Sequence, residues 1–210
     1  MKTPHRLRPF GPYGEIGEFL PPRANVLVHE SPLHLGLNTT SVQDQWQGRI
    51  SYAELQSPGA IYRELQSLRV THILWANGSS TGWNCLGHDL GFWNFVENYA
   101  TDKHIFGHLA IASMPAQPPP DTFNDRVAAL TCGGAYARGW YRLGALRVPQ
   151  FGGPLPSPDA SLGDESDVVD KAGFIVTEPR CANLPDAVTR LFHPPASRGP
   201  WRIYVRRTHD

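Results

Sequence analysis

Cysteine, lysine and long apolar runs are all scarce in this chain of 210 residues. The three cysteines, Cys85, Cys132 and Cys181, lie far apart and form no Cys-x-x-Cys pair, which argues against a structural zinc site. Their odd number argues against a secreted domain held together entirely by disulfides, but it leaves room for one bridge and one free thiol. The chain is long enough to fold on a hydrophobic core without such cross-links.

No stretch approaches the roughly 18 apolar residues of a membrane-spanning helix, and the N-terminus lacks the apolar segment of a signal peptide. We therefore expect a soluble chain with no direct membrane span. The formal net charge is zero, so no bulk electrostatic attraction to nucleic acid or anionic lipid is expected. Nucleic acid is accordingly not an expected partner.

Glycine and proline are abundant, at 20 residues each, and indicate many loops. The Pro- and Gly-rich residues 1–22 are expected to form an irregular N-terminal arm. Residues 23–210 are predicted to form a single α/β domain, because a chain of this length fits one such unit or two closely packed halves.

Short β-branched and aromatic runs predict strands, and runs with apolar residues three or four positions apart predict helices between them. The expected strands are 25–30, 70–75, 104–111, 127–131, 174–178 and 201–206, and the expected helices open at Ser57-Pro58, His88-Asp89, Glu165 and Leu184-Pro185. This alternation predicts an α/β fold with a mostly parallel or mixed sheet and flanking helices. The strands expected to be buried together in one sheet contain Val26, Leu27, Val28, Ile73, Leu74, Ile175 and Val176.

Two halves of the chain, residues 23–115 and 125–208, share the order strand, loop, helix, strand, helix, strand. Their central strands are centred on Ile73 and Ile175, which lie 102 positions apart. The residue identities barely match. The similarity is therefore one of pattern, and both a duplication and a coincidence stay open.

The segment 77–82, NGSSTG, follows an expected strand and raises the question of a phosphate-binding loop. It lacks the Lys of a Walker loop and the glycine spacing of a dinucleotide fingerprint, so it predicts no cofactor. Ligands of α/β sheets commonly bind at the carboxyl ends of strands. Asn77, Ser79 and Ser80 are therefore candidate ligand contacts for a sugar or phosphate, and a solvated loop is the alternative.

A second candidate is the segment 29–34, HESPLH, which resembles the metalloprotease motif HExxH. Its histidines are five positions apart with Pro32 between them, so they cannot share one helical face, and no metal site is predicted. We expect His29 and Glu30 to line a cleft with Asp44 at a strand end, or to be solvated. The chain has no nucleophile elbow either, and no catalytic residue is predicted.

Five segments in order carry a family resemblance: FLPPRANVLVHE, LGLNTTSVQDQWQGRISY, IYRELQSLRVTHILW, FIVTEPRC and RGPWRIYVRR. Together they resemble the soluble C-terminal domain of bacterial polytopic membrane glycosyltransferases. These are the dolichyl-phosphate-mannose mannosyltransferase-like and aminoarabinose-transferase-like proteins. The resemblance runs from about Phe19 to Arg207, and it rests on no catalytic motif.

In that family a multi-helix membrane domain precedes this region and holds both the catalytic acidic residue and the lipid-phosphate donor. We find no counterpart of it in the sequence, so no catalytic residue is carried over to any position. The resemblance implies a noncatalytic accessory or binding domain at the extracytoplasmic face of a membrane, with a polytopic membrane protein or a glycan as partner.

Two alternatives stay open beside this one. The first is a stand-alone enzyme acting on a sugar or nucleotide, with His29, Glu30 and Asp44 around the segment 77–82. The second is a pure protein-interaction domain without a small ligand.

Overall fold

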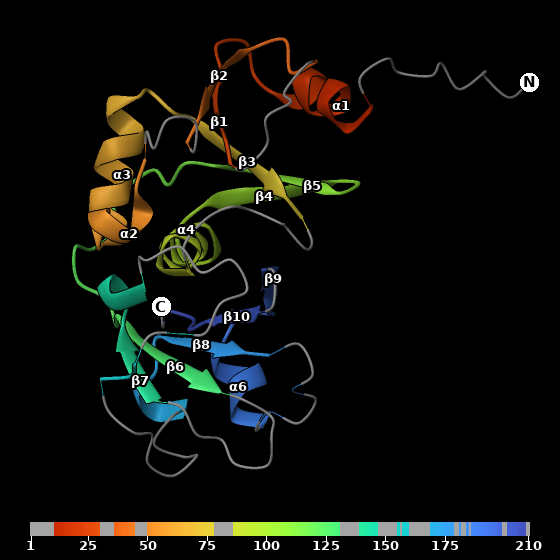
Figure 1. Cartoon of the computed structure of the whole chain (residues 1–210). Coiled ribbons are helices and arrows are strands. Elements are labelled where there is room, and N and C mark those ends of the chain that lie inside the picture. Colours follow the sequence, from red (N-terminus) through yellow and green to blue (C-terminus); the bar gives the residue numbers. More distant parts are fainter. Residues whose placement is uncertain are drawn as a thin grey trace, which may run out of the picture.

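The computed structural model describes residues 11–29, 36–44, 50–77, 86–130, 139–146, 155, 157–159, 169–178, 181, 184, 186–198 and 201–208. These residues form two five-stranded mixed sheets with helices between and outside them (Figure 1). The predicted α/β class is confirmed, and so is the division into two halves, because each half supplies one sheet.

Sheet A contains the strands of the first half, in the order β2-β1-β3-β5-β4. Their bounds are β1 Asn25–Val28, β2 Thr40–Gln43, β3 His72–Ala76, β4 Thr101–Phe106 and β5 Leu109–Ser113. β1 pairs in parallel with both β2 and β3, whereas β5 pairs antiparallel with β3 and β4. The carboxyl ends of β1, β2 and β3 therefore lie at one edge of this sheet.

Sheet B contains the strands of the second half, in the order β7-β6-β8-β10-β9. Their bounds are β6 Arg126–Leu130, β7 Gly139–Arg142, β8 Phe174–Thr177, β9 Ala196–Arg198 and β10 Trp201–Val205. Only β6 and β8 are parallel, and the three other pairs are antiparallel. Cys181, four residues after β8, is buried and is part of a disulfide.

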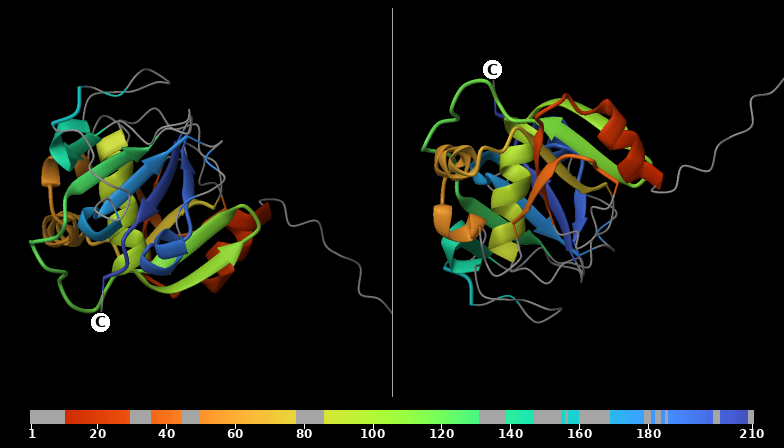
Figure 2. Two further views of the ribbon diagram at one scale, coloured as in Figure 1. Left: turned by 90° about the horizontal axis from the view of Figure 1, so that it is seen from below. Right: turned by 90° about the horizontal axis from the view of Figure 1, so that it is seen from above.

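Helices separate and cover the two sheets, so that the molecule has five layers (Figures 1 and 2). The helices are α1 Gly11–Phe19, α2 Tyr52–Leu55, α3 Pro58–Ser67, α4 Leu86–Asn98, the 3₁₀ helix η2 Leu143–Leu146, and α6 Asp186–Leu191. α1 covers the outer face of sheet A, and α6 covers the outer face of sheet B. α2, α3 and α4 fill the middle layer.

The three internal strands of sheet A, β1, β3 and β5, are mostly apolar because both of their faces are covered. Side chains alternate between the two faces of a strand. Val26, Val28 and Leu74 pack in one core with Ile16 of α1. Leu27, in the same strand β1, points to the opposite face and belongs to the core around α4.

Sheet B follows the same rule, and α4 also packs on its inner face. Ala128 and Ile175 pack with Val188 of α6. Val176 points the other way, into the core that contains α4 and the inner face of sheet A. Residues 86–96 of α4 are all buried, as expected for a helix covered on every side.

The start of α3 follows the sequence prediction. The Ser57 hydroxyl accepts a hydrogen bond from the Ala60 amide at 3.0 Å, which caps the helix, and Pro58 occupies the first turn. Ile61 and Leu65 then lie on the buried face. The local signals and the tertiary packing agree here.

The two halves have the same order of elements along the chain and across their sheets. In each half the first strand is internal, the second is an edge strand, and the last two form an antiparallel pair. In the first half, α3 and α4, which precede and follow the third strand β3, pack on the same face of sheet A. In the second half, the helical residues 169–171 and α6, which precede and follow the third strand β8, likewise pack on one face of sheet B. The halves differ at the second strand, since β2 is parallel to β1 while β7 is antiparallel to β6.

The prediction that all seven core residues share one sheet is wrong. All seven are buried, but Ile175 and Val176 belong to sheet B, and the other five belong to sheet A. Sheet A ends at β4, an edge strand whose side chains are mostly exposed. After β5 the chain continues to β6, which belongs to a second sheet on the other side of α4 and packs its inner face on that helix.

Three local predictions are also corrected. Residues 11–19 of the expected irregular arm form α1, which Ile16 anchors in the core, whereas residues 1–10 lie outside the described residues. The expected strand 104–111 is instead two strands, because Gly107 adopts a φ of +60° and turns the chain. Residues 40–43, which are in none of the expected strands, form β2, and this strand is only partly buried.

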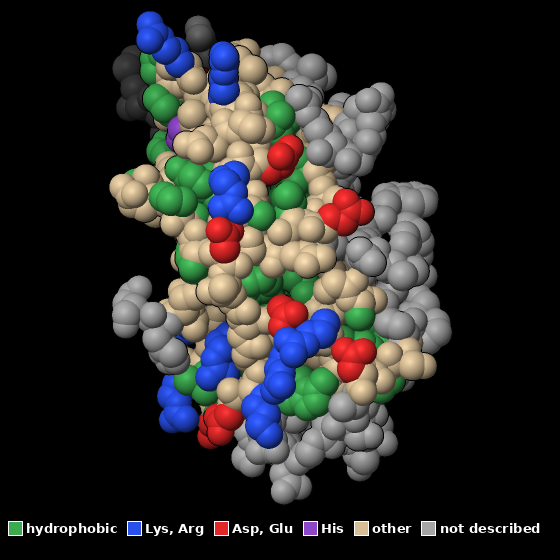
Figure 3. Space-filling model, turned by 90° about the vertical axis from the view of Figure 1, so that its left-hand side faces the viewer, with side chains coloured by type: hydrophobic (Ala, Val, Ile, Leu, Met, Phe, Trp, Pro, Cys, Tyr) green, Lys and Arg blue, Asp and Glu red, His purple; other side chains and the backbone are tan. Residues whose placement is uncertain are grey.

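Among the described residues, the face formed by α2 and α3 shows no concentration of one charge. Basic and acidic side chains are mixed there, with hydrophobic side chains in small areas between them (Figure 3). Arg63 and Asp121 form an exposed pair of 2.9 Å. Over the described part of the chain, no helix combines the length and the apolar character needed to span a bilayer.

Gly173, which immediately precedes β8, lies very close to Asn124, which lies just before β6. A Cβ atom at this position would lie 1.9 Å from the Asn124 carbonyl oxygen, so Gly173→Ala must displace backbone. We expect a loss of about 2 kcal/mol in the free energy of unfolding, measured with urea. Gly144→Ala is the matched control, because its nearest neighbour would be 3.9 Å away. Equal stability of the two variants would contradict this packing.

Candidate functional site

His29 and Asp44 form a direct contact at the carboxyl edge of sheet A. His29 directly follows β1, and Asp44 directly follows β2. The His29 Nδ1 atom lies 2.5 Å from the Asp44 Oδ2 atom. The sequence prediction that these two side chains meet at neighbouring strand ends therefore agrees with the geometry.

Aromatic groups enclose this pair. The Tyr52 hydroxyl of α2 donates a hydrogen bond of 2.8 Å to the same Asp44 oxygen. The His29 ring stacks on Phe92 of α4, with 3.4 Å between the centroids and 10° between the planes. The His88 ring contacts Tyr52 edge-on at 4.8 Å. The cluster thus joins sheet A to both α2 and α4.

The electrostatics of the cluster favour an ionised Asp44. Burial acts to raise the pKa of its carboxyl group, but the neighbouring His29 and the hydrogen bonds from His29 and Tyr52 outweigh burial. The pKa of Asp44 consequently lies below its ordinary value.

The predicted cleft lined by His29 and Asp44 is wrong. Their side chains are only 1% and 0% exposed, and Phe92 covers the His29 ring. A buried carboxylate requires partners, and here His29 and Tyr52 both contact the Asp44 Oδ2 atom. The predicted contacts Glu30, Ser79 and Ser80 lie outside the described residues.

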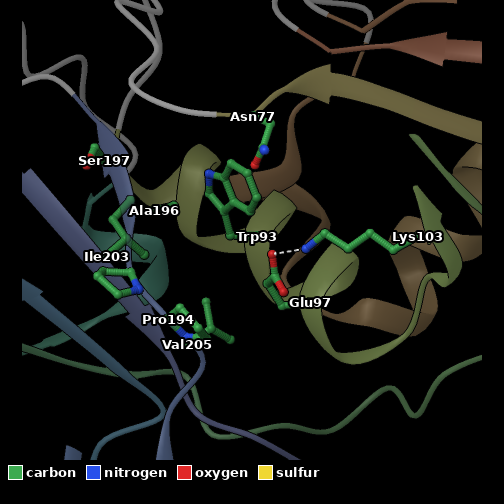
Figure 4. A pocket seen from close by; sticks show the side chains of 10 residues that line it. Asn77, Trp93, Glu97, Lys103, Pro194, Ala196, Ser197, Ile203 and Val205 are labelled. Atoms are coloured by element: carbon green, nitrogen blue, oxygen red, sulfur yellow. Dashed lines mark hydrogen bonds and ion pairs between the residues drawn. The ribbon is translucent and has the colours of Figure 1, made fainter. Parts of the chain in front are cut away.

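Asn77 lies in a different place, in a pocket of about 240 Å³ between the two halves (Figure 4). We call this the inter-sheet pocket. Its lining residues are Asn77, Trp93, Glu97, Lys103, Pro194, Pro195, Ala196, Ser197, Ile203 and Val205.

The two walls of the inter-sheet pocket differ in polarity. The first half supplies the Asn77 amide, the Trp93 ring, and the side chains of Glu97 and Lys103. The second half supplies a largely apolar wall in which Ser197 is the single hydroxyl side chain. Figure 4 shows the two groups of side chains facing each other across the pocket.

An ion pair fixes the polar wall. The Lys103 ammonium lies 2.7 Å from the Glu97 carboxylate and 5.4 Å from the centre of the Trp75 ring. The second carboxylate oxygen of Glu97 lies 4.0 Å from Nδ1 of His193. Burial lowers the pKa of His193, Glu97 opposes this, and the net pKa is below the ordinary value of histidine.

Sequence reasoning missed all of the pocket except Asn77. Glu97 and Lys103 come from the end of α4 and from β4, and neither belongs to a recognisable motif. The apolar wall, residues 194–205, is about a hundred positions further along the chain. No local pattern could bring these segments together.

A metal site does not emerge from the part of the chain that the structure describes. No three His, Cys, Asp or Glu side chains gather there in a way that could hold an ion. His34, from the segment that resembles HExxH, is not among the described residues.

Comparisons with models of known protein families, with curated proteins and with solved structures find no significant match to this chain. The interpretation of the site therefore rests on its geometry.

Asp44→Asn tests the structural role of the buried pair. The substitution removes the negative charge that faces His29, and we expect a loss of about 3 kcal/mol in the free energy of unfolding at pH 7. The folded-state pKa of Asp44 is depressed. Its contribution is therefore present above the unfolded pKa of about 3.9 and is lost as the pH falls through the folded-state value.

Urea unfolding at pH 7 and at stepwise lower pH measures both effects. The stabilities of wild type and Asp44→Asn should converge as the pH falls below about 4. Asp170→Asn is the control, because Asp170 is exposed and its loss should change stability by less than about 0.5 kcal/mol. An Asp44→Asn variant as stable as this control would show that the pair is not structural.

Proposed function

We propose that this chain is a noncatalytic binding domain that holds a sugar unit of a glycan in the inter-sheet pocket. The observation that carries the proposal is the pairing of an aromatic ring with hydrogen-bonding groups in one small pocket. The small exposed part of Trp93, 5% of the residue, offers an apolar surface, and Asn77, Glu97 and Lys103 offer donors and acceptors around it. A pyranose ring has the complementary pattern, with apolar C–H faces and hydroxyl groups at its edge.

The size of the pocket supports a small ligand. Its volume of about 240 Å³ is below the roughly 300–1,000 Å³ typical of pockets for drug-sized molecules. One sugar ring is a better match than a nucleotide. The exposed Asn77 side chain makes no hydrogen bond within the described residues, so its amide is available to a ligand.

The enzyme alternative loses its main support from the geometry. A general base must come within hydrogen-bonding distance of the proton that it removes. The predicted acid–base residues His29 and Asp44 are instead buried against Phe92 and Tyr52. We accordingly propose that the chain transfers no sugar by itself.

The disulfide at Cys181 supports the expected compartment. Structural disulfides persist in oxidising environments and are rare in the reducing cytosol. This is consistent with the extracytoplasmic position that the glycosyltransferase resemblance implies. A membrane glycosyltransferase that presents the same glycan is the corresponding proposed partner.

Asn77→Ala tests the pocket directly. Titration of the full chain with glucose and with N-acetylglucosamine, followed by NMR, should show binding to the wild type. Loss of one hydrogen bond to the ligand corresponds to about 1 kcal/mol, so Asn77→Ala should weaken binding about fivefold. Gln66→Ala, which removes an exposed amide from α3, is the control and should bind as the wild type does. Absence of binding for every sugar would refute the proposed function.

The absence of catalysis has its own test. The pure chain, incubated with lipid-linked and nucleotide-linked sugar donors, should give neither transfer nor hydrolysis. Turnover that Asp44→Ala abolishes would instead support the enzyme alternative. The melting temperature of that variant must be measured as well, because the buried pair is expected to stabilise the fold.

A further inference from the structure

The charges that line the inter-sheet pocket offset each other. Among the described residues that line the pocket, only Glu97 and Lys103 are charged, and they are paired at 2.7 Å. The side chain of the nearby His193 is 17% exposed, and its Nδ1 atom lies 4.0 Å from the Glu97 carboxylate. Its Nε2 atom donates a hydrogen bond of 2.8 Å to the side-chain oxygen of Asn98. Arg207 also lowers the pKa of His193, but it is not among the residues that line the pocket. A ligand with a net charge would have to disrupt the Glu97–Lys103 pair in order to gain a partner.

Apart from the Ser197 hydroxyl, the described side chains of the opposite wall offer no hydrogen-bonding group. Pro194 and Pro195 have no amide N–H, and the side chains of Ala196, Ile203 and Val205 are aliphatic. A sugar hydroxyl placed against this wall would lose its water partners without replacement, which is unfavourable. A methyl group in the same position would be removed from water, and this burial is favourable.

From these two properties we infer that the pocket selects a neutral sugar that carries a methyl-ended substituent. Two sources have this chemistry: the acetamido group of an N-acetylhexosamine and the methyl group of a 6-deoxyhexose. The ring lies on the side of Trp93 and Asn77, and the methyl group lies on the wall formed by Pro194, Pro195 and Ala196. This inference rests on the proposed function and makes it more specific.

A panel of five sugars tests the inference on the full-length chain. The panel contains glucose, N-acetylglucosamine, fucose, the cationic glucosamine and the anionic glucuronate. Burial of one methyl group should make N-acetylglucosamine, fucose or both bind about fourfold more tightly than glucose. Glucosamine and glucuronate should both bind more weakly than glucose.

Reciprocal variants test the role of the ion pair. Glu97→Gln leaves the Lys103 charge without its partner, so this variant should gain affinity for glucuronate relative to the wild type. Lys103→Met keeps most of the aliphatic stem and leaves Glu97 unpaired, so it should gain affinity for glucosamine. If the ion pair had only a structural role, each variant would bind all five sugars more weakly to the same degree. Neither variant would then change its preference between the cationic and the anionic sugar.

Ala196→Ser tests the apolar wall. The added hydroxyl should reduce the preference for the methyl-bearing sugars over glucose to less than twofold. Ala187→Ser is the matched control, because Ala187 packs in the core on the opposite face of sheet B and should leave the preference unchanged. Melting temperatures of both variants verify that they fold.

The outcomes separate this inference from the proposed function. Binding of glucose that equals the binding of both N-acetylglucosamine and fucose would overturn the inference and leave a sugar site in place. Tightest binding of glucuronate or glucosamine by the wild type would overturn it as well. Absence of binding for all five sugars would overturn the proposed function and the inference together.

Discussion

The burial of α4 on every side is the constraint on which the rest of the structure depends. The inner faces of both sheets are apolar, and one helix satisfies them together, with α2 and α3 beside it. A helix in that position must be apolar around its whole circumference, and its few polar groups must find partners inside the protein. Asn94, for example, accepts a hydrogen bond from Asn98 at 2.9 Å.

The same helix places the two polar centres of the molecule. Phe92 and Trp93 are consecutive, and they serve different centres. Phe92 stacks on His29 and covers the buried His29–Asp44 contact at the edge of sheet A, whereas Trp93 lines the inter-sheet pocket. The buried pair therefore fixes the helix against sheet A, and the pocket forms where the helix leaves space beside sheet B. We interpret the first centre as structural and the second as the binding site.

Sequence patterns predicted those parts of the fold that depend on neighbouring residues. The uniformly apolar strands around Leu27, Ile73 and Ile175 could be recognised, because strands covered on both faces lack alternation. The cap at Ser57-Pro58 is equally local. β2 could not be recognised, because it is short and only partly buried, and tertiary pairing determines it. The contact of His29 with Asp44 was predicted from strand ends, but its burial depends on Phe92, which a linear pattern does not place. The pocket depends on segments a hundred positions apart.

The position of α4 also defines how the two halves are related. α4 and α6 occupy equivalent places in their halves, but α4 covers the inner face of sheet A and α6 covers the outer face of sheet B. The inner face of sheet A is therefore equivalent to the outer face of sheet B. α4 also covers the inner face of sheet B, which is equivalent to the outer face of sheet A that α1 covers. The halves are therefore stacked head to tail, as successive units of a repeat are, and they do not face each other across a two-fold axis. A head-to-tail contact joins two different surfaces and does not close on itself. If the halves arose by duplication, a further unit could be added with the same kind of contact only on the outer faces of the two sheets, which α1 and α6 cover.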